Sequence, residues 1–176
     1  MEIIKYTPEQ ILKEKWIQFD PVNNNENELP NAAGLYIICL KSSINIPNPF
    51  NIKIQYQKFS DLRVLYIGEG CNLKKRDYKD HFKGTARKST LRKSIGTLFK
   101  YTRKDLKDGK YCFIPEHEAK LTAWMRQSLV MYYFIIPNYE KKLINLLSAP
   151  LNLNKNKNSI NLEFSKQLKK LRNTRY

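Results

Sequence analysis

Three continuous apolar runs constrain the fold of this chain more than any other feature. They are "AAGLYIICL" at 32–40, "VLYIG" at 64–68 and "LVMYYFII" at 129–136. Short runs of this kind, rich in β-branched and aromatic residues, are typical of strands buried on both faces. Glycines or prolines follow or flank them, as at Pro137. The pattern therefore predicts a small buried sheet of three strands.

Amphipathic segments and capping residues between these runs predict helices. Thr7, Pro8 and Gln10 form a capping-box pattern at the start of "YTPEQILKEKWIQF", Asn72 is a plausible N-cap, and Asn138 followed later by Pro150 brackets another segment. The segment "NIKIQYQ" alternates well enough for an extra strand. The helices are expected within 6–19 and at about 73–82, 89–106, 116–127, 139–147 and 163–171.

The domain organisation follows from these elements. The chain has 176 residues with 41% apolar content, which suffices for one core. We expect a helical appendage and linker at 1–30, one domain at 31–152 with an insertion at 41–63, and a basic tail at 153–176.

The charge of the chain predicts a polyanionic partner. There are 32 Lys and Arg against 16 Asp and Glu, a formal net charge of +16. The segment from Lys74 to Lys110 contains fourteen basic residues and four Asp. The alternative is that such a run is only a solvated surface. Here, however, the basic residues alternate with apolar residues at helical spacing, so that Arg92, Lys93 and Lys100 are expected to face outward. We therefore expect contact with nucleic acid.

The chain carries no sign of a membrane or of a disulfide framework. There is no apolar run long enough to span a bilayer, and "MEIIKYTPEQ" lacks the layout of a secretory signal. The three cysteines lie far apart, without zinc-ligand spacing, and are expected to be reduced thiols. These features predict a soluble, cytoplasmic protein with no membrane partner.

Two tyrosines are candidates for a site. Strand alternation places Tyr66 and Gly68 on one face, and Tyr36 of the first strand can share that face if the two strands pair. Gly68 lacks a Cβ, so a phosphate could approach the strand end there, under the helix that carries Arg76. The alternative is that each tyrosine is a core aromatic.

The distribution of carboxylates singles out Glu140. It is the only acidic residue between Ala119 and Leu162 and lies in the first turn of an expected helix. A favourable contact with the helix dipole explains such a residue equally well. If the chain cuts phosphodiesters with a metal, however, the scarcity of acids favours one hard cation held by one Glu.

These residues together resemble the GIY-YIG nuclease family over about 34–152. "GLY" at 34–36 and "YIG" at 66–68 match the two naming motifs, and Arg76 follows Tyr66 by ten residues, the family's spacing for an arginine. "EKKLINLLSAPLN" resembles the closing pattern, from Glu140 to Asn152.

The resemblance implies an α+β fold with a small central three-stranded antiparallel sheet flanked by helices. It implies a metal-dependent DNA endonuclease, of restriction type or structure-specific, with one Mg²⁺ or Mn²⁺ per active site held by Glu140. Tyr36, helped by His81, would take the proton of the attacking water, Tyr66 would orient the water or a phosphate oxygen, Arg76 would stabilise developing charge and Asn152 would support the site.

The sequence departs from the family pattern in two places. The gap between Tyr36 and Tyr66 is long, so an insertion must be looped out, which is a candidate recognition element. The family histidine more often lies four residues after the arginine, where Asp80 stands here, and His81 comes fifth, rotated by about 100° on an ideal helix. The alternative for His81 is an exposed helix residue. His117, which has no motif around it, is expected at the surface.

A second class of function competes with the enzyme: a nucleic-acid-binding protein that keeps the fold without turnover. The complete residue set favours the enzyme. The partner is expected to be duplex or branched DNA, with specificity from the insertion, the basic helices or a homodimer. The residues expected to contact nucleic acid are Lys74, Lys75, Arg87, Lys88, Arg92 and Lys93.

Overall fold

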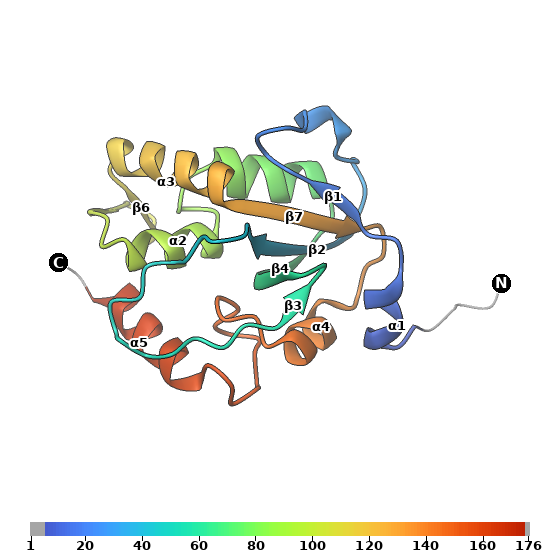
Figure 1. The fold of residues 1–176 in the computed structure, drawn as a ribbon. Helices are drawn as coiled ribbons and strands as arrows, with labels where there is room; N and C mark the ends of the chain where they lie inside the picture. Colours follow the sequence, from blue (N-terminus) through green and yellow to red (C-terminus); the bar gives the residue numbers. More distant parts are fainter. Residues whose placement is uncertain (1–5, 175–176) are drawn as a thin grey trace.

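A five-stranded antiparallel sheet forms the centre of the protein (Figure 1). The computed structural model describes residues 6–174. Strand order is β1-β7-β2-β4-β3, and β5 and β6 form a separate hairpin. The elements are α1 Pro8–Lys13, β1 Ile17–Phe19, η1 Glu26–Glu28, β2 Gly34–Leu40, β3 Lys58–Phe59, β4 Leu62–Gly70, η2 Lys74–Lys83, α2 Thr90–Leu98, β5 Arg103–Asp105, β6 Tyr111–Phe113, α3 Pro115–Ser128, β7 Leu129–Phe134, α4 Glu140–Leu147 and α5 Leu162–Asn173.

The three strands expected from the apolar runs are the middle of this sheet. β2 pairs with β4 on one side and with β7 on the other, both antiparallel, and every residue of β2 is buried. The sheet is nevertheless wider than predicted, because the short strands β1 and β3 extend its two edges. These edge strands have two or three residues each, too few for an alternation pattern to reveal them.

Helices cover both faces of the sheet, which explains the continuous apolar runs. One face packs against η2, α2, α3 and α5 through side chains such as Phe82, Ile95, Met125 and Phe164. The other face packs against α1 and α4. In Figure 1, α3 lies above β7 and α4 lies on the opposite side of the sheet. The α+β class is confirmed.

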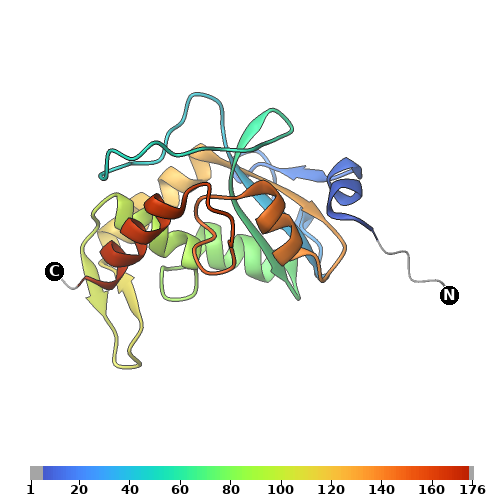
Figure 2. The ribbon, with the colours of Figure 1, turned by 90° about the horizontal axis from the view of Figure 1, so that it is seen from below.

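Several predicted elements have other limits or another form. "NIKIQYQ" is not a strand, and residues 51–57 cross the molecule without regular structure (Figure 2). The helix expected at 89–106 ends at Leu98, and β5 begins five residues later. "IQF" at the end of the first predicted helix is strand β1. The Thr7 capping box and the helices near 116–127 and 163–171 are present.

The insertion and the tail pack against one another. Phe50 of the insertion meets Phe164 of α5 with ring centroids 5.8 Å apart. The Asn161 side chain accepts from the Gln55 amide and donates to the Gln55 carbonyl, each at 2.9 Å. Phe164 and Leu168 are fully buried. Figure 2 shows 41–57 running alongside α5. The two segments thus pack on one another, and α5 also packs against α2. Among residues 6–174, no helix has the length and apolar character that a membrane crossing requires.

Candidate active site

Pairing of β2 with β4 brings the two tyrosines together. Tyr36 lies opposite Gly68 in the register, and the Tyr36 and Tyr66 rings are 6.3 Å apart. A Cβ on residue 68 would lie 2.1 Å from the Tyr36 hydroxyl. The Tyr36 ring therefore occupies the space that we expected a phosphate to use. Glycine is needed at position 68 to make room for this tyrosine.

A π-helix carries Arg76 and His81 to the same place. η2 is π-helical over its full length, from Lys74 to Lys83, so its hydrogen bonds close on the fifth residue instead of the fourth. Each turn holds an extra residue, and position i+5 takes nearly the place that i+4 has in an α-helix. The shift of the histidine by one residue is thereby compensated. Asn72, expected as the N-cap, lies one residue before the N-cap position Leu73, and its side chain accepts from the Lys75 amide at 2.8 Å.

His81 is paired with Tyr36. Its Nε2 lies 2.9 Å from the Tyr36 hydroxyl, and its Nδ1 lies 2.6 Å from Ser89 Oγ. The imidazole has no exposed surface, which overturns the alternative of an exposed helix histidine. Burial, followed by the charges of Arg76 and Arg92, holds the pKa of His81 well below its usual value. The ring is therefore neutral at pH 7 and able to accept a proton.

Arg76 lies against both tyrosines. Its Nη1 donates to the Lys88 carbonyl at 3.1 Å and lies 3.7 Å from Asp80. Burial opposes the charge, but the oxygens of Tyr36, Tyr66 and Asp80 hold the pKa of Arg76 above its usual value. The Arg76 guanidinium is thus held at the site, in its charged form, by the oxygen atoms around it.

A pocket of about 240 Å³ lies in front of this cluster. Tyr66, Arg76 and Glu140 line it, and Glu69, Lys155 and Arg172 contribute further charges. Tyr36 and His81 lie behind Tyr66, whose ring is 5.9 Å from that of His81 and whose hydroxyl is 3.1 Å from Thr90 Oγ1. The pocket thus places two carboxylates and several cations within one small volume.

Glu69 is a pocket residue that sequence reasoning missed. It follows Gly68 on β4, and its carboxylate accepts hydrogen bonds from the Asn138 amide at 2.9 Å and the Glu140 amide at 3.4 Å. Glu69, not the Asn138 side chain, therefore caps the start of α4, and Asn138 itself has a left-handed backbone with φ of 72°. The adjacency of Glu69 to "YIG" was the one available signal.

The site has oxygen ligands for a hard cation but no complete ligand set. No group of three or more His, Cys, Asp or Glu that could hold a metal occurs within residues 6–174. Glu140 pairs with Lys155, and Glu69 lies next to it in the pocket. Carboxylates are the ligands that Mg²⁺ prefers, with water and phosphate as the usual complement. The donor chemistry therefore fits one such ion.

Asn152 fixes the loop after α4 to strand β4. Its side chain accepts from the Ile67 amide at 2.8 Å and donates to the Ile67 carbonyl at 2.7 Å. Ile67 stands between Tyr66 and Gly68. The oxygen and the nitrogen of the Asn152 side-chain amide are thus both bonded to the backbone of β4.

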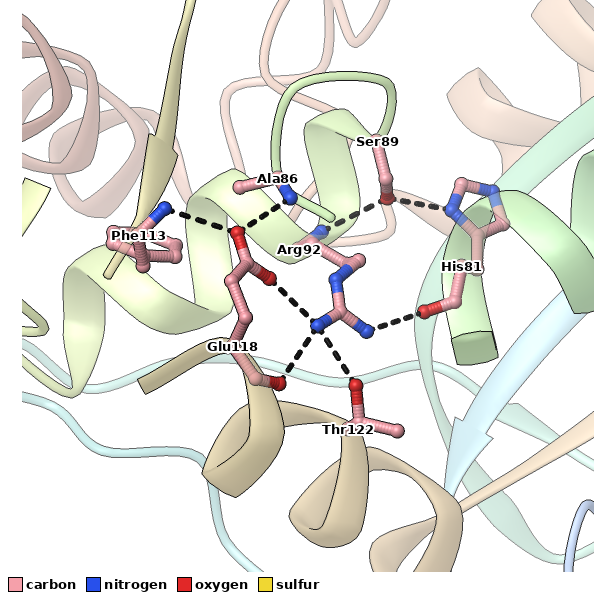
Figure 3. Close-up of polar contacts among 7 residues, drawn as sticks. All are labelled: His81, Ala86, Ser89, Arg92, Phe113, Glu118 and Thr122. Carbon is pink, nitrogen blue, oxygen red and sulfur yellow. Dashed lines mark hydrogen bonds and ion pairs between the residues drawn. The ribbon is translucent and has the colours of Figure 1, made fainter. Parts of the chain in front are cut away.

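Arg92 does not face solvent, contrary to our expectation. Its side chain is fully buried and donates to the carboxylate and carbonyl of Glu118, to Thr122 and to the His81 carbonyl (Figure 3). The Glu118 carboxylate also accepts from the amides of Ala86 and Phe113. Arg92 therefore cannot contact a phosphate, and its helical position was misassigned because Lys93 and Arg92 are equally polar in sequence.

The other predicted basic residues lie at the surface or near it. Lys75, Arg87 and Lys88 are exposed, whereas Lys74 and Lys93 are half-buried. Arg87 pairs with Asp108, and Lys74 donates to Asn27. Because the Lys88 carbonyl holds Arg76, Lys88 is next to the site. His117 is half-buried and accepts from the Thr102 amide, stacked on Tyr101.

The fold and this residue set agree with the one comparison that gave a match. A family model described as the GIY-YIG catalytic domain matches residues 34–174. The chain therefore belongs to the GIY-YIG family. Members of this family are generally endonucleases, act on nucleic acid and typically use divalent metal ions. No curated protein and no solved structure matches the chain.

Proposed function

We propose that this protein is a metal-dependent endonuclease that hydrolyses phosphodiester bonds of DNA, as a restriction-type or structure-specific enzyme. The observation that carries the proposal is the buried hydrogen bond between Tyr36 and His81, directly behind a pocket that holds Arg76 and Glu140. A protein that only bound nucleic acid would have no need for a neutral histidine behind a tyrosine at such a pocket.

The proton path begins at Tyr36. As general base, Tyr36 takes the proton of the attacking water while its own hydroxyl proton passes to Nε2 of His81, 2.9 Å away. A neutral His81 is required for this transfer, and burial together with Arg76 and Arg92 supplies that state. Ser89, at Nδ1, keeps the ring in place. Tyr66 orients the water or a phosphate oxygen from the pocket wall.

Cations of the pocket stabilise the negative charge of the substrate phosphate. Arg76 stabilises the charge that develops on the phosphate oxygens, and removal of one such preorganised donor typically costs about 10²–10³ in rate. Glu140, with Glu69 beside it, would hold the divalent ion, which stabilises charge on the phosphate and leaving oxygens when bound. Lys155, which pairs with Glu140, is placed to exchange this partner for a substrate phosphate.

The experiment is cleavage of plasmid DNA with Mg²⁺ and with EDTA, by the wild type and by Glu140→Gln. This change keeps the size of the side chain and removes the charge that a hard cation needs. We expect cleavage to fall by several orders of magnitude, since metal stabilisation contributes several kcal/mol and each 1.36 kcal/mol is about tenfold. DNA affinity should hold or rise slightly.

Glu163→Gln is the matched control, because Glu163 also lies in the first turn of a helix but is exposed and outside the pocket. It should cleave like the wild type. If Glu140→Gln in Mg²⁺, or the wild type in EDTA, cleaves as fast as the wild type in Mg²⁺, Glu140 is not a metal ligand. DNA binding without any cleavage would identify the protein as an inactive nucleic-acid-binding member of the family.

A further inference from the structure

A second, larger pocket adjoins the candidate active site. It has a volume of about 420 Å³ and lies between the end of α2, the β5–β6 hairpin and the end of α5. Arg172 lines this pocket and the catalytic pocket alike. The two pockets are therefore neighbours that share this arginine, whose Nη1 also donates to Ser94 Oγ at 3.3 Å.

A buried hydroxyl in this pocket lacks a partner. Tyr111 lines the pocket with 8% of its surface exposed, and its hydroxyl has no hydrogen-bond partner within residues 6–174. Buried polar groups are nearly always satisfied, so the hydroxyl of this pocket-lining residue needs a partner from outside the described residues, which a water or a ligand in the pocket can supply. Phe113 and Leu171 supply apolar surface around it.

Cations are gathered around the same tyrosine. The Arg103 guanidinium lies 4.0 Å from the centre of the Tyr111 ring, and the Lys93 ammonium lies 4.9 Å from it. Burial, and then the charges of Arg172, Lys110 and Arg103, lower the pKa of Lys93. Asp105 and Asp108 are paired with arginines and leave a positive excess here. The pocket therefore attracts an anion that also carries an apolar or aromatic part.

An unpaired nucleotide has this combination of properties. Flat bases taken out of a stack are held on aromatic or guanidinium planes, with hydrogen bonds to their edges. Tyr101 cannot offer a ring face, because Phe99 and His117 stack on it at 5.2 and 4.7 Å. The guanidinium of Arg103, already backed by the Tyr111 ring, is the flat cationic surface that the pocket offers a base.

We infer that this pocket is a subsite for an unpaired nucleobase of the substrate strand, held by Arg103 and Tyr111, and joined to the cleavage site through Arg172. The inference rests on the proposed nuclease function and narrows its substrate class. The enzyme would act on nucleic acid that carries an unpaired nucleotide near the cut, in preference to a fully paired duplex.

The test compares three fluorescent duplexes of equal length in EDTA, so that no cleavage occurs. One is fully paired, one carries a single unpaired nucleotide, and one carries an abasic site at that position. By fluorescence anisotropy we expect the unpaired base to improve affinity about 5- to 100-fold over the other two, the range given by base stacking on such surfaces. Equal affinity for all three overturns the subsite.

Variants assign the effect to the pocket. Tyr111→Phe removes only the unpartnered hydroxyl, and Arg103→Lys keeps the charge but removes the flat guanidinium, so each should reduce the preference for the unpaired base. Lys104→Ala is the matched control, because Lys104 is an exposed cation on the same strand that does not line the pocket. It should weaken binding of all three duplexes alike.

The outcomes separate this inference from the proposed function. A preference that survives unchanged in Tyr111→Phe and Arg103→Lys overturns the pocket as its source, while cleavage of plasmid by the same protein leaves the nuclease proposal standing. If the wild type does not cleave DNA with Mg²⁺ but does prefer the duplex with the unpaired base, the nuclease proposal is contradicted and the subsite is supported.

Discussion

The position of Tyr36 depends on the missing Cβ of Gly68 as well as on the hydrogen bond with His81. The hydroxyl and ring lie directly over Gly68, and His81 blocks movement away from the strand. We expect Gly68→Ala to cost about 1–3 kcal/mol in unfolding free energy, as overpacking typically does. Cleavage should be lost, because the Tyr36 ring must leave His81. Urea unfolding and a plasmid assay measure the two effects.

The same substitution in a Tyr36→Ala background is the control. Removal of the ring opens the space that the new methyl needs, so the added cost of Gly68→Ala should nearly disappear, which a double-mutant cycle detects. An equal cost in both backgrounds would show that Tyr36 is not the group that requires glycine at this position.

His81 links the stability of the protein to pH. Its pKa in the folded state lies well below the usual 6.5, so the unfolded chain binds a proton first as the pH falls. Stability is therefore complete above pH 6.5 and decreases below it. Between pH 7.5 and 5.5 we expect His81 to account for a loss in unfolding free energy on the order of 1 kcal/mol. Denaturant unfolding at the two pH values measures it.

His81→Gln should lack this increment, and His117→Gln should retain it, since His117 lies half-exposed at the surface. An identical pH dependence in the wild type and His81→Gln would mean that folding leaves the pKa of His81 unchanged, and the depressed pKa attributed to its burial would have to be abandoned.

Among the elements, α2 is the one that holds the site helices together. Arg92 of α2 donates to the His81 carbonyl in η2 and pairs with Glu118 of α3 at 2.7 Å (Figure 3). Loss of one partner of a buried ion pair typically costs about 3–5 kcal/mol, because the other charge remains buried without compensation. We expect Arg92→Met to lose that much in chemical unfolding.

Lys88→Met is the matched control, a change of a basic residue to Met just before the same helix. Lys88 is exposed, so its loss should change stability by no more than about 0.5 kcal/mol. If Arg92→Met were as stable as the control, the network in Figure 3 would be dispensable, and the positions of η2 and α3 would have to depend on apolar packing alone.

The elements that sequence reasoning found were those with strong apolar patterns. β2, β4 and β7, and with them Tyr36, Tyr66 and Gly68, followed from continuous apolar runs. The π-helical form of η2 could not be read, because a π-helix has no residue preference distinct from that of an α-helix in one sequence. The contact of His81 with Tyr36 depends on the π-helical form of η2, so the sequence alone could not predict it.

Arg92 and Glu118 illustrate a second limit. Each is a charged residue in a helix, and charged residues are mostly exposed, so only the long-range pairing of α2 with α3 shows that they are buried. Arg172 was likewise hidden, since its place between two pockets arises from the packing of α5 against α2. Long-range contacts of this kind leave no local signal.

At the scale of the whole molecule, the candidate site combines residues from several distant parts of the chain. Strand β2 gives Tyr36, β4 gives Tyr66, η2 gives Arg76, α4 gives Glu140 and the end of α5 gives Arg172. The N-terminal helix α1 lies on the other side of the sheet from η2 and α2 (Figure 1). The basic residues expected to contact nucleic acid can therefore be compared with equally exposed lysines on α1 or just after it.

The net charge of +16 predicts binding of nucleic acid that is strongly dependent on salt. If six to ten phosphates are contacted, affinity should fall by about 10³–10⁵ between 50 and 200 mM salt, because bound counterions are released on association. Arg87→Ala with Lys88→Ala should weaken binding and reduce the slope of log affinity against log salt by about 2, one for each phosphate contact. Lys13→Ala with Lys15→Ala removes the same charge from exposed positions on the α1 side, and should leave the slope unchanged. A slope that falls equally in both double variants would mean that net charge alone, with no defined interface beside η2 and α2, accounts for the binding.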